Sequence, residues 1–204
     1  MKAKFPYLAK SDLDQEQRQF WEMLTLGERG FYTGGADAVR LPDLYNAWLY
    51  FVPLGRMATT LGERIRTADA LDGKLRELIV LTTSARLGAL VEFDFHIPFA
   101  LDQGIDRGVI ERLRNNETPD LPDPLLESVY LGNLQLLDGA SMDPDVRDRI
   151  IGGIGYGGLM QMIATVVLYV ATAYTVNVAG VELAEDFSAD ENALKEYYAG
   201  LRRG

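Results

Sequence analysis

Apolar residues recur at spacings of three and four along most of the chain, which is the period of an amphipathic helix. Strict apolar–polar alternation, the pattern of strands, is scarce. The clearest helix runs over 71–87, and Gly88 is placed to end it in the left-handed conformation. A second helix follows to Gln103 and ends at Gly104. We therefore predict an all-α fold with a central antiparallel hairpin of helices joined at Gly88.

Capping residues and prolines divide the rest of the chain into further helices. Ser11 is the expected N-cap of the first helix, and Pro53 is expected to end or kink the second. The turn-rich connector 115–122 is the one candidate internal boundary. The remaining predicted helices cover 11–26, 41–53, 53–66, 106–114, 124–137, 144–153, 157–179 and 191–201.

The stretch 150–181 contains no charged residue and is long enough to cross a bilayer. Glycines near its start, together with Gln161 and Asn177, interrupt its apolar character. These features favour a helix buried on all sides, within one subunit or between subunits, over a membrane span. The tyrosines of this region are expected in the core, with a pocket or a subunit interface as the alternative: Tyr156, Tyr169 and Tyr174.

Composition narrows the function classes. At 204 residues the chain fits one domain, 1–204. It has no cysteine, which excludes disulfides, thiolate metal sites and cysteine nucleophiles and favours a cytoplasmic location. The 30 acidic against 20 basic residues give a net charge of −10, which argues against nucleic-acid and anionic-membrane partners. A single histidine excludes a multi-histidine metal centre.

That histidine, His96, is the first candidate for chemistry, because its side chain titrates near neutral pH. It lies among aromatic residues, and Glu92 precedes it by four positions, so the two side chains share a helix face. A carboxylate beside an imidazole raises the imidazole pKa and fixes its tautomer. The alternative is a structural histidine hydrogen-bonded inside a packed hairpin.

Glu77 is the second candidate. It precedes the Gly88 turn by 11 residues, and His96 follows that turn by 8. At 1.5 Å per residue these positions rise to about 16 and 12 Å, so the two side chains reach comparable heights in the hairpin. The alternative is a surface glutamate paired with Lys74 or Arg76.

These residues form a recognisable pattern. Leu75-Arg-Glu-Leu-Ile-Val-Leu, followed by Ala89-Leu-Val-Glu-Phe-Asp-Phe-His-Ile-Pro-Phe-Ala and Gln103-Gly-Ile, resembles the signature of the carboxymuconolactone decarboxylase family, which has the alkylhydroperoxidase-like fold. The resemblance extends roughly over 11–184 and leaves 185–204 as an acidic tail. It also includes Gly27-Glu-Arg-Gly30, Tyr169 and Asn177.

The resemblance implies a function. Peroxidase members of the superfamily use two cysteines, but the matching positions here are Ala89 and Glu92, which excludes a thiol peroxidase. The Glu-x-x-x-His form resembles the decarboxylase branch, which implies a cofactor-independent lyase or isomerase acting on a small carboxylated lactone or a related aromatic-catabolism intermediate. No metal is implied either.

The same resemblance suggests roles for individual residues. His96 becomes the general acid or base, Glu92 its partner or the second proton carrier, and Glu77 the residue that orients the imidazole. Arg29, Tyr169 and Asn177 become candidate substrate-binding residues, Arg29 because a guanidinium matches carboxylate geometry. The alternative for Arg29 is a loop arginine that braces a helix end. Members of the family commonly form trimers or hexamers, so a homo-oligomer is expected. Two alternatives stay open: a non-catalytic binding or scaffold oligomer, and a hydrolase using the same Glu and His site.

Overall fold

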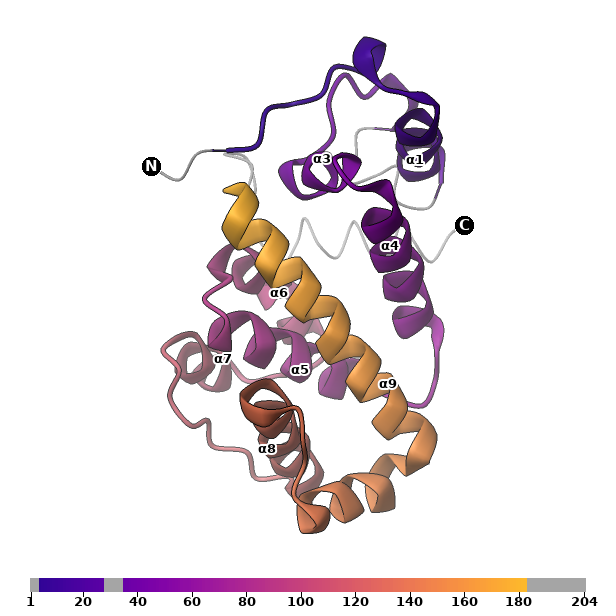
Figure 1. Cartoon of the computed structure of the whole chain (residues 1–204). Coiled ribbons are helices and arrows are strands. Elements are labelled where there is room, and N and C mark those ends of the chain that lie inside the picture. The colour runs from indigo at the N-terminus through magenta and orange to yellow at the C-terminus, as the bar shows by residue number, and fades with distance from the viewer. Residues whose placement is uncertain (1–3, 28–34, 183–204) are drawn as a thin grey trace.

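The computed structural model describes residues 4–27 and 35–182. This part of the chain contains helices and no strands, which confirms the all-α prediction (Figure 1). Its elements are η1 (Lys10–Asp12), α1 (Gln15–Leu26), η2 (Gly35–Asp37), α3 (Asp43–Leu49), α4 (Val52–Thr67), α5 (Gly73–Arg86), α6 (Leu90–Asp102), α7 (Arg107–Arg114), α8 (Pro124–Gly139) and α9 (Pro144–Ala179). The predicted tail helix over 191–201 lies outside the described residues.

The central hairpin forms as the sequence predicts. Gly88, with φ of 65°, ends the turn after α5, and Gly104, with φ of 76°, follows α6. Both conformations are inexpensive for glycine alone, because a Cβ would crowd the backbone. The Ala89 amide donates to the Ser84 carbonyl at 2.8 Å, which closes the turn. The hairpin of α5 and α6 is therefore fixed by backbone chemistry at one glycine.

The predicted Ser11 cap is wrong. Ser11 lies in the 3-10 turn η1, and its hydroxyl donates to Asp12. Asp14 caps α1 instead: its carboxylate accepts from the Gln17 amide at 2.8 Å, while the Gln17 side chain accepts from the Asp14 amide at 2.9 Å. A charged acceptor with this reciprocal partner satisfies two free amides, so it prevails over the serine.

Prolines begin helices here rather than ending them. Pro42 precedes α3, and Pro53 lies in the first turn of α4, where its missing N–H leaves no hydrogen bond unmade. The break between the two predicted helices therefore falls at Tyr50 and Phe51, just before Pro53.

The two helices predicted over 144–153 and 157–179 are joined into the long helix α9. Gly155, with φ of 69° and ψ of 178°, produces a kink between them. Helix α9 as a whole contacts α3, α4, α5, α6 and α8, and the part beyond the kink crosses the molecule (Figure 1). This helix connects the two ends of the protein.

Helix α5 occupies the centre, with ten of its fourteen residues buried. One hydrophobic cluster surrounds it with residues of α6, α7, α8 and α9. A second cluster joins α1, α3 and α4 to Val80 of α5 and to Leu168 and Tyr169 of α9. Helices α5 and α9 thus contribute to both clusters, and they carry the candidate residues Glu77 and Tyr169.

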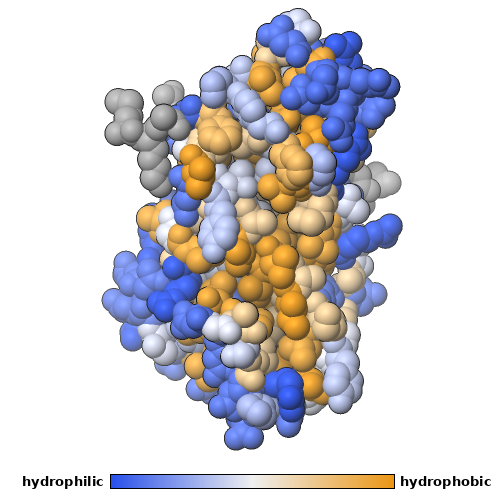
Figure 2. Space-filling model, in the orientation of Figure 1, coloured by the Kyte–Doolittle hydropathy of each residue, from blue (hydrophilic) through white to orange (hydrophobic). Residues whose placement is uncertain are grey.

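Within one subunit α9 is only partly buried, and its burial between subunits stays a prediction. It is the one helix in the described ranges long and apolar enough to cross a membrane, and half of its most apolar window is buried within the subunit. Tyr169 is buried, but Tyr156 and Tyr174 are 77% and 60% exposed, so placing these two in the core is wrong. The exposed face of α9 belongs to the apolar band that Figure 2 shows.

We expect Gly55→Ala to lower the free energy of unfolding by about 1–3 kcal/mol. A Cβ at Gly55 would lie 2.6 Å from the fully buried Phe20 ring and 2.8 Å from the Trp48 Cβ, so the core must shift. Gly152→Ala is the matched control: nothing lies within 4 Å of its Cβ, so helix propensity should stabilise the protein by about 0.5–1 kcal/mol. Urea denaturation measures both, and equal effects of the two changes would contradict the packing argument.

Candidate active site

The hairpin brings Glu77 and His96 together. Glu77 comes from the middle of α5, His96 from the middle of α6, and the carboxylate Oε2 lies 2.7 Å from the imidazole Nδ1. Glu77 is 4% exposed, so the alternative of a surface glutamate is wrong. Its other oxygen accepts from the Arg76 Nε at 3.2 Å, so the Arg76 contact of that alternative is nonetheless present. The height match counted from the Gly88 turn is thereby confirmed.

The second ring nitrogen of His96 faces two further polar groups. Glu92 Oε1 lies 3.3 Å from Nε2, as the spacing of four residues within α6 predicts. The Tyr169 hydroxyl, supplied by α9, also lies 3.3 Å from Nε2. The imidazole therefore stands between a carboxylate on one side and a carboxylate with a phenol on the other.

Aromatic rings enclose the imidazole. The ring centroids of Phe95, Phe99 and Tyr169 lie 5.6, 5.2 and 5.2 Å from that of His96. His96 is 7% exposed and Glu92 is 9% exposed. Such surroundings exclude most water and strengthen the electrostatic interactions of the charged groups within them.

Opposite influences act on the His96 pKa. Burial lowers it, because a charged ring is poorly solvated there, but the charge and hydrogen bond of Glu77, assisted by Glu92, outweigh burial and raise the pKa of His96 to about 9. For Glu77, burial raises the pKa, but His96 and then Arg76 hold it below its ordinary value. The site therefore contains an imidazolium paired with a carboxylate at neutral pH.

Tyr169 is protonated at neutral pH. Burial is the main cause that raises its pKa above the ordinary value, while Arg66 and Arg76 act in the opposite direction. Because the imidazolium carries a proton on Nε2, the oxygen of this neutral phenol accepts on that side and its O–H can donate to another acceptor. The guanidinium groups of Arg66 and Arg76 both place positive charge near the Tyr169 hydroxyl.

Comparison with known families matches residues 53–131 to the carboxymuconolactone decarboxylase family model. Residues 53–131 are therefore similar to this family. The match covers the hairpin with Glu77, Glu92 and His96, and it ends before α9 and Tyr169. No curated protein matches the sequence.

Two other predicted residues of the carboxymuconolactone decarboxylase pattern do not join the cluster. Asn177 lies eight residues beyond Tyr169, about 12 Å along α9, and its amide donates to the Leu87 carbonyl at 2.9 Å. It ties α9 to the α5–α6 turn, so the geometry gives no support to a substrate-binding role. Arg29 lies outside the described residues. Asp94, two residues before His96 on α6, pairs with Arg114 instead.

The sequence did not single out Arg66 or the phenylalanine rings as part of the site. The aromatic pattern around His96 indicated a ring-lined environment, which Phe95 and Phe99 provide. Nothing in the local sequence of Arg66 connects it to Tyr169, because the two residues lie on α4 and α9 and only the packing of these helices relates them.

Two cavities lie away from this cluster. One of about 660 Å³ lies between the start of α5, α7 and the connector before α8, and it includes Lys74 and Arg112. The other, of about 310 Å³, is lined by Asn177 and the Gly88 turn. Neither is lined by Glu77, Glu92 or His96. Within the described ranges no three acidic or histidine side chains are grouped to hold a metal.

We expect the His96 ring to titrate near pH 9 in the folded protein. The chain has one histidine, so its imidazole signals in an NMR titration are unambiguous. Glu77→Gln should bring the His96 pKa to 6.5 or below, because the charge of Glu77 no longer outweighs burial, which lowers this pKa. Glu127→Gln, an exposed change on α8, serves as the control and should leave the pKa unchanged. A wild-type pKa between 6 and 7 would refute the ion pair.

The same shift makes stability depend on pH. The folded pKa of His96 is above the unfolded value of 6.5, so its contribution is complete below pH 6.5 and is lost as pH rises through 9. The advantage in unfolding free energy of the wild type over His96→Gln should therefore shrink by roughly 2–3 kcal/mol between pH 6.5 and 9.5. Denaturant melts of both proteins at several pH values test this. A constant difference would mean that His96 is neutral when folded.

Proposed function

We propose that this protein is a cofactor-independent acid–base enzyme of the carboxymuconolactone decarboxylase type, a lyase or isomerase acting on a small carboxylated lactone or a related intermediate of aromatic catabolism. One observation carries the proposal: a single imidazolium, held at Nδ1 by Glu77, with Nε2 beside Glu92 and the Tyr169 hydroxyl. The family match over 53–131 supports the reaction class.

The direction of proton transfer follows from the charge state. Because the His96 pKa is about 9, the ring carries its proton at neutral pH and acts first as an acid. Glu77 holds Nδ1–H and stabilises the charged ring, which leaves Nε2–H as the proton to donate. Glu92, at 3.3 Å from Nε2, is placed to return a proton to the ring after each turnover.

In a decarboxylation the substrate loses CO₂ when its C–C bond breaks, and the electron pair of that bond moves into the conjugated lactone as an enolate. The enolate carbon then takes the Nε2 proton, which shifts the double bond and leaves neutral His96. The Tyr169 hydroxyl can donate a hydrogen bond to the enolate oxygen. One proton from solvent restores the imidazolium, so the cycle balances.

The charges around the cluster favour an anionic substrate. Arg66 on α4 and Arg76 on α5 both act on the Tyr169 hydroxyl. Arg76 already contacts Glu77, whereas Arg66 is exposed at the end of α4. A guanidinium suits a carboxylate, so Arg66 is the candidate for substrate binding that the structure adds to Arg29.

The thiol chemistry of related peroxidases is excluded, because the chain has no cysteine. A non-catalytic oligomer and a hydrolase remain the alternatives to the lyase. A hydrolase would release a ring-opened acid and no CO₂, and a non-catalytic protein would give no turnover in any variant.

We expect turnover of carboxylated γ-lactones to fall as pH rises through about 9, because the acid form of His96 is lost. Glu77→Gln should move this alkaline limit to lower pH, whereas Glu127→Gln should not. His96→Asn should lower kcat by about 10²–10⁴-fold. CO₂ release and ultraviolet absorbance measure the reaction. A kcat for His96→Asn equal to that of the wild type, on a substrate that the wild type decarboxylates, would sink the assignment.

A further inference from the structure

One face of α9 carries a row of large apolar side chains that the subunit leaves uncovered. We call it the α9 stripe, and it consists of residues with exposed fractions of 53% to 77%: Tyr156, Met160, Val167, Tyr174 and Val178. No charged residue interrupts it, because 150–181 has none. Figure 2 shows an apolar band across the middle of this face of the molecule.

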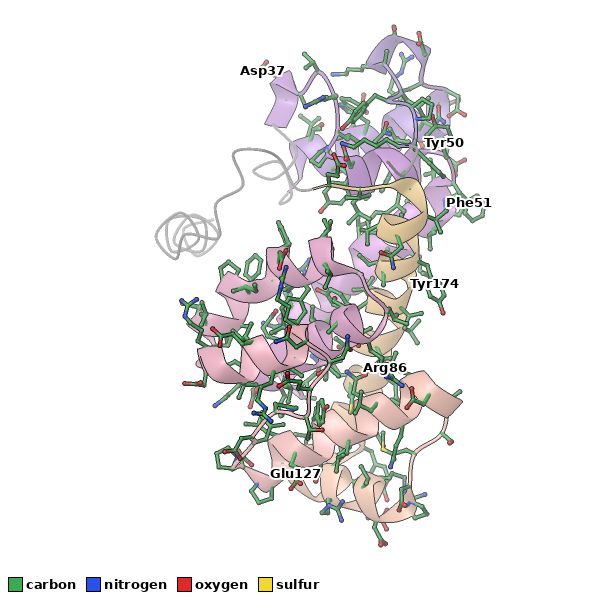
Figure 3. All side chains as sticks on the ribbon, turned by 90° about the vertical axis from the view of Figure 1, so that its left-hand side faces the viewer. Asp37, Tyr50, Phe51, Arg86, Glu127 and Tyr174 are labelled. Carbon is green, nitrogen blue, oxygen red and sulfur yellow. The ribbon has the colours of Figure 1, made fainter. Side chains whose placement is uncertain are left out.

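The α9 stripe is large for a monomer. Its ends, Tyr156 and Val178, are 22 positions apart, which is about 33 Å along the helix. Its side chains expose on the order of 600 Å² of apolar surface, against roughly 800 Å² per partner in a stable interface. Phe51, 64% exposed, projects on the same side as Tyr174 (Figure 3). An apolar patch of this size marks a contact surface.

The spacing of the stripe is symmetric. Tyr156 and Val178 each lie 11 residues from Val167, and Met160 and Tyr174 each lie 7 residues from it. An antiparallel copy of α9, related by a two-fold axis through Val167, would place Tyr156 opposite Val178 and Met160 opposite Tyr174. Val167 would meet its own copy. A self-complementary surface of this kind is what a two-fold dimer requires.

We propose that the α9 stripe binds a second copy of this chain, packed antiparallel along α9 with the two-fold axis at Val167. The proposed interface does not include the residues of the acid–base site, so this inference stands independently of the proposed activity. It lies on the exposed side of the helix whose buried side presents Tyr169 to His96.

Two observations favour a second copy over a bilayer. A helix that spans a bilayer is apolar on all sides. The inner face of α9 instead carries polar groups that pack within the subunit: Gln161 donates to the Ile65 carbonyl at 2.9 Å, and Thr165 and Tyr169 are buried. Helices that lie on membrane surfaces carry lysine or arginine at the polar edge, whereas this stretch has no charge and the chain has a net charge of −10. The symmetric spacing of the stripe also favours a second copy, because binding to an unrelated partner or to lipid does not require such symmetry.

The absence of cysteine permits a sharp test. Val167→Cys introduces a single thiol on the axis, which a short bis-maleimide should join to its own copy. Tyr156→Cys should not join to itself, because its copies lie about 33 Å apart, but it should join to Val178→Cys when the two proteins are mixed. Val39→Cys, at a position 84% exposed outside α9, is the control for random collision and should not cross-link.

The assembly itself is measured by size-exclusion chromatography with light scattering. The wild type should be a dimer, or a hexamer containing two-fold contacts, and Val167→Glu should reduce its mass at least two-fold because two carboxylates would meet at the axis. Val39→Glu should leave the mass unchanged, and circular dichroism checks that both variants fold.

Three results would overturn the proposal: a monomeric wild type, cross-linking of Val167→Cys no faster than that of Val39→Cys, or a cyclic trimer in which Val167→Cys does not join. Sedimentation of wild-type monomer with phosphatidylcholine vesicles, abolished by Val167→Glu, would assign the stripe to a lipid surface instead.

Discussion

The buried contact between Glu77 and His96 is the interaction on which the rest of the site depends. At 2.7 Å and almost completely buried, each group is tolerable in the interior because of the other. A buried charge left alone costs about 3–5 kcal/mol, so the pair constrains how α5 and α6 can align. It also sets the charge of the ring, because without the carboxylate burial would favour neutral imidazole.

The order of the residues around that pair determines what it can do. The Nδ1 side of His96 is taken by Glu77, and the Nε2 side faces Glu92 and Tyr169. The chain has no cysteine, so this cluster consists of two carboxylates, an imidazole and a phenol and contains no thiol.

Helix α9 serves two purposes on opposite faces. Its inner face completes the site with Tyr169 and packs on α4 and α5. Its outer face is apolar and exposed, and the kink at Gly155 separates it from the segment that packs on α8. If a second copy covers the stripe, assembly would stabilise the helix that holds the tyrosine, and the site would depend on the oligomer through α9.

The sequence by itself determined the helical class and the hairpin at Gly88, and it placed Glu77 and His96 at comparable heights in that hairpin. These follow from local chemistry, because a glycine turn and the rise of 1.5 Å per residue place the two side chains opposite each other. The capping residue of α1 was missed, since Ser11 and Asp14 are both good caps and the reciprocal Gln17 contact decides between them.

Only the tertiary structure decided which side chains from distant helices lie near His96. Tyr169 reaches His96 across 73 residues, Arg66 approaches from α4, and Asn177 is drawn away to the Leu87 carbonyl. The same holds for α9: its uncharged sequence is compatible with a core helix or an interface helix, and only packing shows which face remains uncovered. Periodicity reports which faces of a helix are apolar, but what covers each face depends on contacts between segments far apart in the chain.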